Sequence, residues 1–556
     1  TDHFRPQFEA IRDGGRPVRV DLRYKGLRAE TTRAAIDMGL DVTVSTKFWC
    51  EHLGLPYHPT VEDTHYRESR YGYGAMLRHA REYRVAYRLW TVGSHRLLLW
   101  ADPEYAARFA RSCRLGGGEG FEIFAPLTNK GYGNAPGRWR IFADPSYESY
   151  QWEQQRYWLY YLVFGRLGYD PRADPAVWRR ELRRRFGRSA ADVEQAYCSG
   201  SRVIPLVTAA RSPSASEWRW WPEIDTGDGL DEYMHTAPGD TGQFYAIRTW
   251  KRTPRWRCEE WDDFPPGYVE DAVSGRLTAR WTPIQVSAEL QRLARETLAA
   301  ADRAEQRAAG PHDSELRATC LDMRTHAHLA EYHAEKTLAA THLAFFEVTG
   351  DTGRLSPALR HVRRTAAAWE QIVQITEGVY HDDLVFGHSE SSKRSTHGHH
   401  HVGHWRDRLD EVLADVAHLE ALLEKHGGES QLLRTYPGEG PPAKLPRVEH
   451  TPIDRAVPGA DLSISARVVG RRRPRQVRLH YRPLDQTMDW RRTEMLSADG
   501  QQFEGTISGD DIEPGWDLMY YIEVLVDGGG LLWPSWRRGQ PYIVVTNDGA
   551  TPGGGS

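Results

Sequence analysis

The stretch from residue 47 to 59, KFWCEHLGLPYHP, contains the densest set of side chains able to do chemistry. Within twelve positions it supplies a cation, an aromatic ring, a carboxylate and two imidazoles, namely Lys47, Trp49, Glu51, His52 and His58. The stretch follows a predicted strand. In a β/α barrel, the carboxyl ends of the strands and the loops after them form the active face. We therefore predict that part of this stretch contacts a substrate.

Cations recur where the other predicted strands end, most of them beside an aromatic residue. A guanidinium group presents a planar fork that matches a carboxylate, and an aromatic face can stack on a sugar ring. The residues that we predict to bind substrate are Arg23, Lys25, Lys47, Trp49, His52, His58, Arg88, Trp90 and Lys130. This pattern predicts an anionic carbohydrate as the partner, such as a glycan that contains uronic acids.

Carboxylates at the same strand ends could perform glycoside hydrolysis. That reaction needs two carboxyl groups, one as general acid and the other as base or nucleophile. Glu51, Glu122 and Glu223 lie on predicted strands or in the loops after them, so we predict that the catalytic pair comes from these three. Ala125 occupies a strand end where an acid would be expected, and whether it marks a lost catalytic acid stays open.

Two other functions fit the same region. In a polysaccharide lyase, a His or Tyr removes the proton next to a uronate carboxyl while Arg or Lys neutralises that carboxyl. The candidates for that role are His52, His58, His65 and Tyr66. A noncatalytic glycan-binding protein would also fit, since Ala125 removes a possible acid and a β-sandwich follows near the C-terminus.

The elements expected to position these residues alternate between strand and helix. The predicted strands cover residues 18–24, 42–49, 84–90 and 121–125, and the predicted helices between them cover 30–38 and 103–113. A mostly helical pattern continues from 152 to 212, and 218–223 could form a late strand. Such alternation is typical of a parallel α/β unit. We predict a TIM-barrel-like catalytic domain over residues 1–280.

The remainder of the chain shows a helical pattern followed by a strand pattern. Apolar residues at helical spacing predict an α-helical bundle over 285–428, with helices near 285–309, 313–348, 355–377 and 404–426. A Pro/Gly-rich linker is expected at 429–454. Short alternating strands then predict an immunoglobulin-like β-sandwich over 455–546, followed by a disordered tail at 547–556.

The composition argues against several classes of function. The chain has 556 residues, 40% apolar and 27% charged, with a formal net charge of −4, which argues against nucleic acid as a partner. No apolar run is long enough to span a bilayer, so we expect a soluble protein, either periplasmic or secreted, or cytoplasmic. Five scattered Cys lack metal-site spacing and phosphate-binding motifs are absent, so we predict neither metal nor cofactor. The His cluster at 397–404 lies in a Gly-rich loop without the spacing of a helical metal site, and whether it binds metal stays open. The oligomeric state stays open.

The order of an α/β region, a helical bundle and a small sandwich resembles multidomain TIM-barrel glycoside hydrolases. The helical region is similar in placement to that of α-glucuronidase-type enzymes. Three segments also look like bacterial polysaccharide-utilisation proteins, namely 47–59, 88–104 (RLWTVGSHRLLLWADPE) and 403–409 (GHWRDRL). The resemblance implies a barrel fold and hydrolysis of an acidic polysaccharide or oligosaccharide. It includes no diagnostic catalytic motif, so it assigns no catalytic residue.

Overall fold

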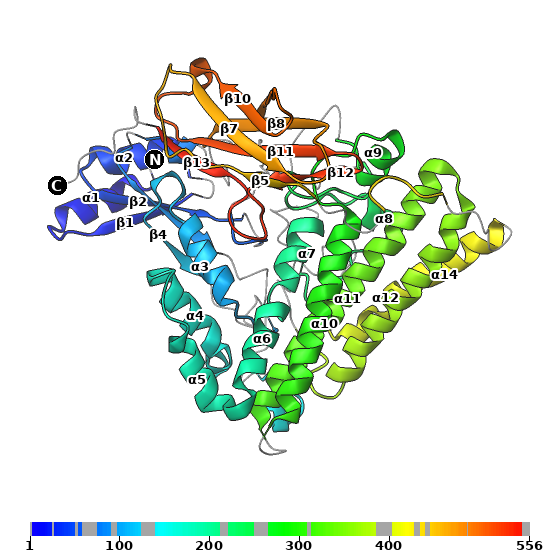
Figure 1. Ribbon diagram of the computed structural model, residues 1–556. Coiled ribbons are helices and arrows are strands. Elements are labelled where there is room, and N and C mark those ends of the chain that lie inside the picture. The colour runs from blue at the N-terminus through cyan, green and yellow to red at the C-terminus, as the bar shows by residue number, and fades with distance from the viewer. Residues whose placement is uncertain are drawn as a thin grey trace.

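A computed structural model shows a mixed α/β protein with three successive parts (Figure 1). They are a parallel sheet with helices, a helical middle, and C-terminal sheets that are almost wholly antiparallel. The structure describes residues 3–24, 27–49, 54–57, 75–79, 81–89, 97–123, 140–211, 221–249, 265–308, 313–384, 403–426, 434–439, 445–485 and 488–547.

The N-terminal part is built on a four-stranded parallel sheet in the order β1-β2-β3-β4. Its strands are β1 (Arg19–Arg23), β2 (Asp41–Lys47), β3 (Arg84–Leu89) and β4 (Gly120–Ile123). The helices in this part are α1 (Arg5–Asp13), α2 (Ala29–Asp37) and α3 (Pro103–Ser112). The four strands and two of the helices confirm the sequence pattern, whereas α1 was not predicted.

Helices follow this sheet along the chain. They are α4 (Trp158–Tyr169), α5 (Ala176–Phe186), α6 (Ala190–Gly200), α7 (Val203–Arg211), α8 (Leu230–Met234) and α9 (Tyr268–Ser274). The late strand expected at 218–223 is a wrong prediction for its described part, because residue 221 lies outside any strand and residues 222–224 form a turn. Pro222 there has no N–H to donate to a strand ladder. A closed barrel stays a prediction, since the described residues supply the four strands β1 to β4 of its parallel sheet.

The helical middle agrees with its periodicity. It consists of α10 (Pro283–Gln306), α11 (Ser314–Thr349), α12 (Leu355–Thr376) and α14 (Leu409–Lys425), which pack in chain order side by side (Figure 1). Local signals set the ends of these helices. Thr282 and Gln285 form a capping box at α10, Asp313 caps α11, and Gly350 ends α11 in the left-handed conformation that suits glycine.

The C-terminal part is a pair of packed sheets. One contains β10 (Gln502–Ile507), β7 (Leu462–Val469) and β5 (Arg447–Glu449). The other contains β6 (Arg455–Ala456), β13 (Ile543–Asn547), β11 (Leu518–Val526), β8 (Gln476–Pro483), β9 (Arg491–Glu494) and β12 (Gly529–Trp533), with β6 and β13 as its parallel pair. Alternate residues such as Ile464, Leu479 and Ile522 form the core between them.

Short 3₁₀ turns complete the described secondary structure: η2 (Ala75–Leu77), η4 (Leu115–Gly117), η5 (Pro145–Tyr147), η6 (Glu153–Tyr157), η7 (Gly187–Ser189), η8 (Thr352–Arg354), η9 (Trp405–Arg408) and η10 (Gly509–Asp511). The largest hydrophobic core joins all three parts, because Tyr87 of β3, Met323 of α11 and Trp536 of the C-terminal part belong to one cluster. The three parts are therefore packed together through buried apolar surface.

Candidate functional site

One face of the four-stranded sheet is polar. Side chains alternate between the faces of a strand, so the apolar Leu22, Val44, Tyr87 and Phe121 share the other face. That apolar face belongs to the core that includes α3, where the rings of Phe109 and Phe121 lie 4.8 Å apart. The residues left for the polar face include Asp21, Arg23, Ser45, Lys47, Arg88 and Glu122.

The register of the strands aligns three of these residues near the carboxyl ends. Lys47 pairs with Arg88, and Arg88 pairs with Glu122, so two cations and a carboxylate stand in adjacent positions of one row. Arg23 is the last residue of β1 and belongs to the same polar face. The sheet therefore brings together four residues that the sequence suggested for the site: Arg23, Lys47, Arg88 and Glu122.

Arg88 links the carboxylates of two other strands. Its Nε forms an ion pair with Glu122 Oε1, and its Nη2 lies 3.7 Å from Asp21 Oδ2. Asp21 also accepts a hydrogen bond of 2.5 Å from the Ser45 hydroxyl. The Arg88 side chain is 16% exposed, whereas those of Asp21 and Glu122 are 45% and 46% exposed. One guanidinium thus orients two solvent-accessible carboxylates. Asp21 was not a candidate from the sequence, because nothing in an alternating strand shows which strands are neighbours.

A second arginine on β3 makes a similar arrangement at the opposite end of the sheet. Arg84 forms an ion pair with Asp41, and its Nε lies 3.4 Å from Glu119 Oε2. Ligand sites of parallel α/β sheets lie at the carboxyl ends of the strands. The Arg88 cluster, which we define as Asp21, Ser45, Arg88 and Glu122, is therefore the candidate site. The Arg84 pairings provide an internal control.

Trp49 follows β2 but is only 2% exposed. Its indole N–H donates to the Tyr57 carbonyl at 2.7 Å, and a Cβ added to Gly54 would lie 2.3 Å from its ring. A ring so enclosed has no free face on which a sugar could stack, and it packs the loop against the core instead. Lys47 is also buried, at the end of β2.

Six sequence candidates lie outside the described residues: Lys25, Glu51, His52, His58, Trp90 and Lys130. The lyase candidates His65 and Tyr66 also lie outside them, as does Ala125.

Glu223 stands apart from the polar face and is fully buried. Its carboxylate accepts hydrogen bonds from the backbone N–H groups of Leu97 at 3.1 Å and Leu98 at 2.8 Å. Its backbone carbonyl accepts the indole N–H of Trp405 at 2.8 Å. Glu223 thereby fixes the segment between β3 and α3 through buried hydrogen bonds, which is a structural role.

Asp322 and His326 of α11 hold the same segment, residues 97–101. Asp322 accepts the Leu99 N–H at 2.7 Å, and the His326 ring lies 3.0 Å from the Leu99 carbonyl through its Nε2. Burial raises the pKa of Asp322 and lowers that of His326 to about 4. The neutral imidazole thus donates from Nε2.

Arg156 and Tyr380 complete the surroundings of Asp322. Arg156 forms an ion pair with Asp322, and both side chains are almost wholly inaccessible to solvent. The Tyr380 hydroxyl donates to Asp322 Oδ1. This network was not predicted from the sequence, where the one signal for it is an acidic residue between Leu321 and Met323 on the buried part of α11. Buried charges need such partners.

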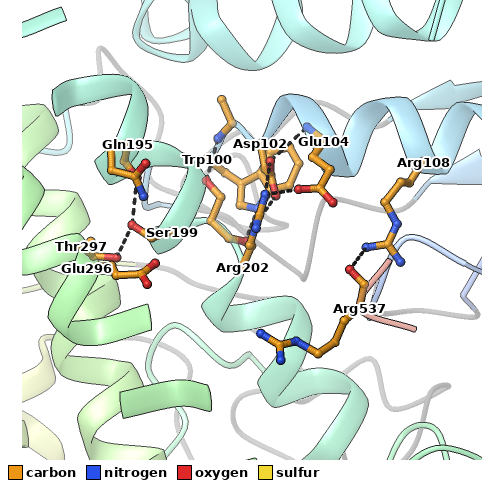
Figure 2. A network of polar contacts seen from close by, with 12 residues as sticks. Trp100, Asp102, Glu104, Arg108, Gln195, Ser199, Arg202, Glu296, Thr297 and Arg537 are labelled. Atoms are coloured by element: carbon orange, nitrogen blue, oxygen red, sulfur yellow. Dashed lines mark hydrogen bonds and ion pairs between the residues drawn. The ribbon is translucent and has the colours of Figure 1, made fainter. Parts of the chain in front are cut away.

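A further polar network fixes the start of α3 (Figure 2). Arg202 points between Asp102 and Glu104, with a distance of 2.7 Å to a carboxylate oxygen of each. Arg108 reaches the backbone carbonyl of Arg537 in the C-terminal part, at 3.4 Å. These residues line a cavity of ≈ 170 Å³. The cavity lies at a junction of the three parts, because its lining includes Leu55, Leu293 of α10 and Trp536.

Among the described residues, no three His, Cys, Asp or Glu side chains gather in a way that could hold a metal ion. Most of the 397–404 His cluster lies outside those residues. His404 is buried, where its Nδ1 accepts the Arg406 N–H at 3.2 Å, and burial lowers its pKa. None of the described helices is both long and apolar enough to cross a membrane.

Comparison with known proteins gives a likeness in fold. No protein-family model matches the chain, and no curated protein matches its sequence. Among solved structures, a GH138 enzyme targeting pectin rhamnogalacturonan II superposes with a TM-score of 0.60 at 13% identity. The match covers 77% of this chain and 59% of that enzyme, so this chain spans less than two thirds of the enzyme's length. The chain is therefore similar in fold to a GH138 glycoside hydrolase.

Proposed function

We propose that this protein is a glycoside hydrolase that acts on an acidic, uronic-acid-containing polysaccharide or oligosaccharide. The observation that carries the proposal is the row of Lys47, Arg88 and Glu122 on one face of the sheet, near the carboxyl ends of its strands. The GH138 enzyme of similar fold targets a pectic polysaccharide, which supports a substrate of this class. A barrel closed by strands beyond β4 belongs to the same proposal.

In this proposal, Glu122 and Asp21 supply carboxyl groups to opposite sides of Arg88. One carboxyl protonates the leaving glycosidic oxygen while the other activates water or attacks the anomeric carbon. Glu51, which follows β2, stays a further candidate for one of these roles.

The cations supply the specificity. Arg23 and Arg88 are partly exposed near the carboxyl ends of β1 and β3, so a uronate carboxylate there would meet their positive charge, to which the buried Lys47 at the end of β2 adds at longer range. Hydrogen bonds between ionised partners are roughly twice as strong as neutral ones. A uronide would therefore bind better than the neutral sugar of the same shape.

The proposal is tested by product release from pectic oligosaccharides, followed by chromatography, with the variants Glu122→Gln and Glu119→Gln. Glu122→Gln should lower kcat by about 10²–10⁴-fold, the usual contribution of a general acid or base. Glu119→Gln is the matched control, because Glu119 faces an arginine of the same strand at the other end of the sheet. It should keep the wild-type rate.

Full activity of Glu122→Gln would contradict the assignment of Glu122. Product that absorbs as an unsaturated uronide would identify a lyase instead, because elimination creates a double bond and hydrolysis does not. Binding of the oligosaccharides without any product would identify a noncatalytic glycan-binding protein.

A further inference from the structure

The outer face of the three-stranded sheet has a groove of ≈ 700 Å³. The groove lies where β5 ends, because β5 pairs only with Arg467 to Val469 of β7, whereas β7 begins at Leu462. Beyond β5, the His450 side chain contacts the edge of β7, with its Nδ1 2.6 Å from the Ser465 carbonyl. Its Nε2 lies 2.7 Å from the Tyr520 hydroxyl. The wall of the groove is thus tied to both sheets.

The lining of the groove is mostly polar. Ser463, Ser465 and Arg467 alternate along the exposed face of β7, and Gln502 of β10 pairs with Arg467. Trp533 adds one aromatic ring, 5.1 Å from the His450 ring. Hydroxyl and amide groups both donate and accept hydrogen bonds, and a guanidinium group donates them, which together suits sugar hydroxyls. A groove for an amphipathic helix would need a row of apolar pockets instead.

One end of this sheet is strongly basic. The turn after β7 reads Arg471-Arg-Arg-Pro-Arg475, and all four of its arginines are exposed. Arg447 of β5 and Arg467 of β7 are exposed at the same end. The carboxylate of the groove lining, Glu449, is paired with Arg447. In a chain with a net charge of −4, this local excess of arginine would attract a polyanion.

We propose that this groove is a second, noncatalytic binding site for an acidic glycan chain. The sugar hydroxyls contact Ser463, Ser465 and Gln502, and carboxylates along the chain meet Arg467 and the arginine turn. The class of glycan rests on the proposed function, but the groove takes no part in hydrolysis. The site would hold a polymer while another stretch of it reaches the Arg88 cluster.

Native electrophoresis through gels that contain polygalacturonate, with dextran gels as the neutral reference, tests the groove in the full-length protein. The wild-type protein should be retarded by polygalacturonate alone. Arg467→Ala should weaken the retardation about tenfold, since a hydrogen bond to a charged group is lost. Ser463→Trp should remove most of the retardation by filling the groove, leaving only the part that comes from binding at the Arg88 cluster. Arg492→Ala is the matched control, because it removes an exposed arginine from β9 of the other sheet.

Retardation of the wild type by dextran as well, or none by polygalacturonate, would overturn the proposal. Equal retardation of the Arg467 and Arg492 variants would also overturn it. Glu122→Gln should be retarded like the wild type, so binding at the groove is separated from catalysis. If the wild type were retarded but released no product from any uronide, the proposal of hydrolase activity would be wrong and the proposal of a binding groove would be supported.

Discussion

Glu122 and Glu223 are both glutamates that the sequence offers as catalytic carboxyls, but their surroundings differ in kind. Glu122 is 46% exposed on the polar face of a sheet and shares Arg88 with Asp21. Glu223 has no solvent exposure and is bound by two backbone N–H groups. A carboxyl that must meet a substrate needs access, whereas one that anchors a segment needs fixed partners. The first is suited to chemistry and the second to stability.

Asp322, like Glu223, is a buried carboxylate that holds the segment 97–101. Removing it should have the largest effect on stability. Asp322→Ala leaves Arg156 charged and buried, which typically costs about 3–5 kcal/mol of unfolding free energy. Urea unfolding measures the change. Asp302→Ala is the control, because Asp302 pairs with Arg324 at an exposed position and such pairs contribute little. Equal losses for both variants would refute a special role for the buried pair.

Glu223→Gln should separate stability from activity. We expect a loss of about 1–3 kcal/mol of unfolding free energy, because the amide accepts the Leu97 and Leu98 N–H groups less strongly than the carboxylate does. The turnover of each folded molecule should remain that of the wild type. Wild-type stability together with lost turnover would return Glu223 to the list of catalytic candidates.

The two arginines of β3 allow a sharper test of the site. Arg88→Lys should lower kcat/KM for a uronide about tenfold, because lysine lacks the fork that links two carboxylates. The neutral analogue of the substrate should lose activity to a similar extent, because the positions of both carboxylates change for either substrate. Arg84→Lys should change neither value, and a comparable loss from it would mean that the carboxyl ends of the strands have no special role.

The buried His326 should make stability depend on pH. Its folded pKa of about 4 lies below the ordinary 6.5, so the unfolded chain binds more protons between these values. This contribution to stability is fully present above about pH 6.5 and is lost as the pH falls toward 4. Acidification from pH 6.5 to 5.5 should cost about 1 kcal/mol through this residue. Urea unfolding of His326→Gln should show a smaller loss of unfolding free energy between pH 6.5 and 5.5 than the wild type shows. An equal loss in both proteins would contradict the role given to His326.

Local patterns predicted most of the described helices and strands, whereas the contacts between distant side chains could not be predicted from them. The strands near 18–24 and 84–90 and the helices near 313–348 and 355–377 lie where the periodicity placed them. Within the run at 218–223, the described residues 221–223 do not form the expected strand, because an apolar, aromatic sequence does not distinguish a strand from a buried turn. Asp21 and Asp322 were missed because their importance comes from partners far away in the chain.

By itself, the sequence determined the order of α/β, helical and β-rich parts, since alternation and helical spacing are local properties of the chain. It also determined that cations and carboxylates follow the strands. Only the tertiary structure decided which of these side chains meet. Strand register placed Lys47, Arg88 and Glu122 in one row, and the packing of α11 against the 97–101 segment buried Asp322 beside Arg156. The physical reason is that exposure and charge pairing depend on distances between segments, which no local pattern encodes.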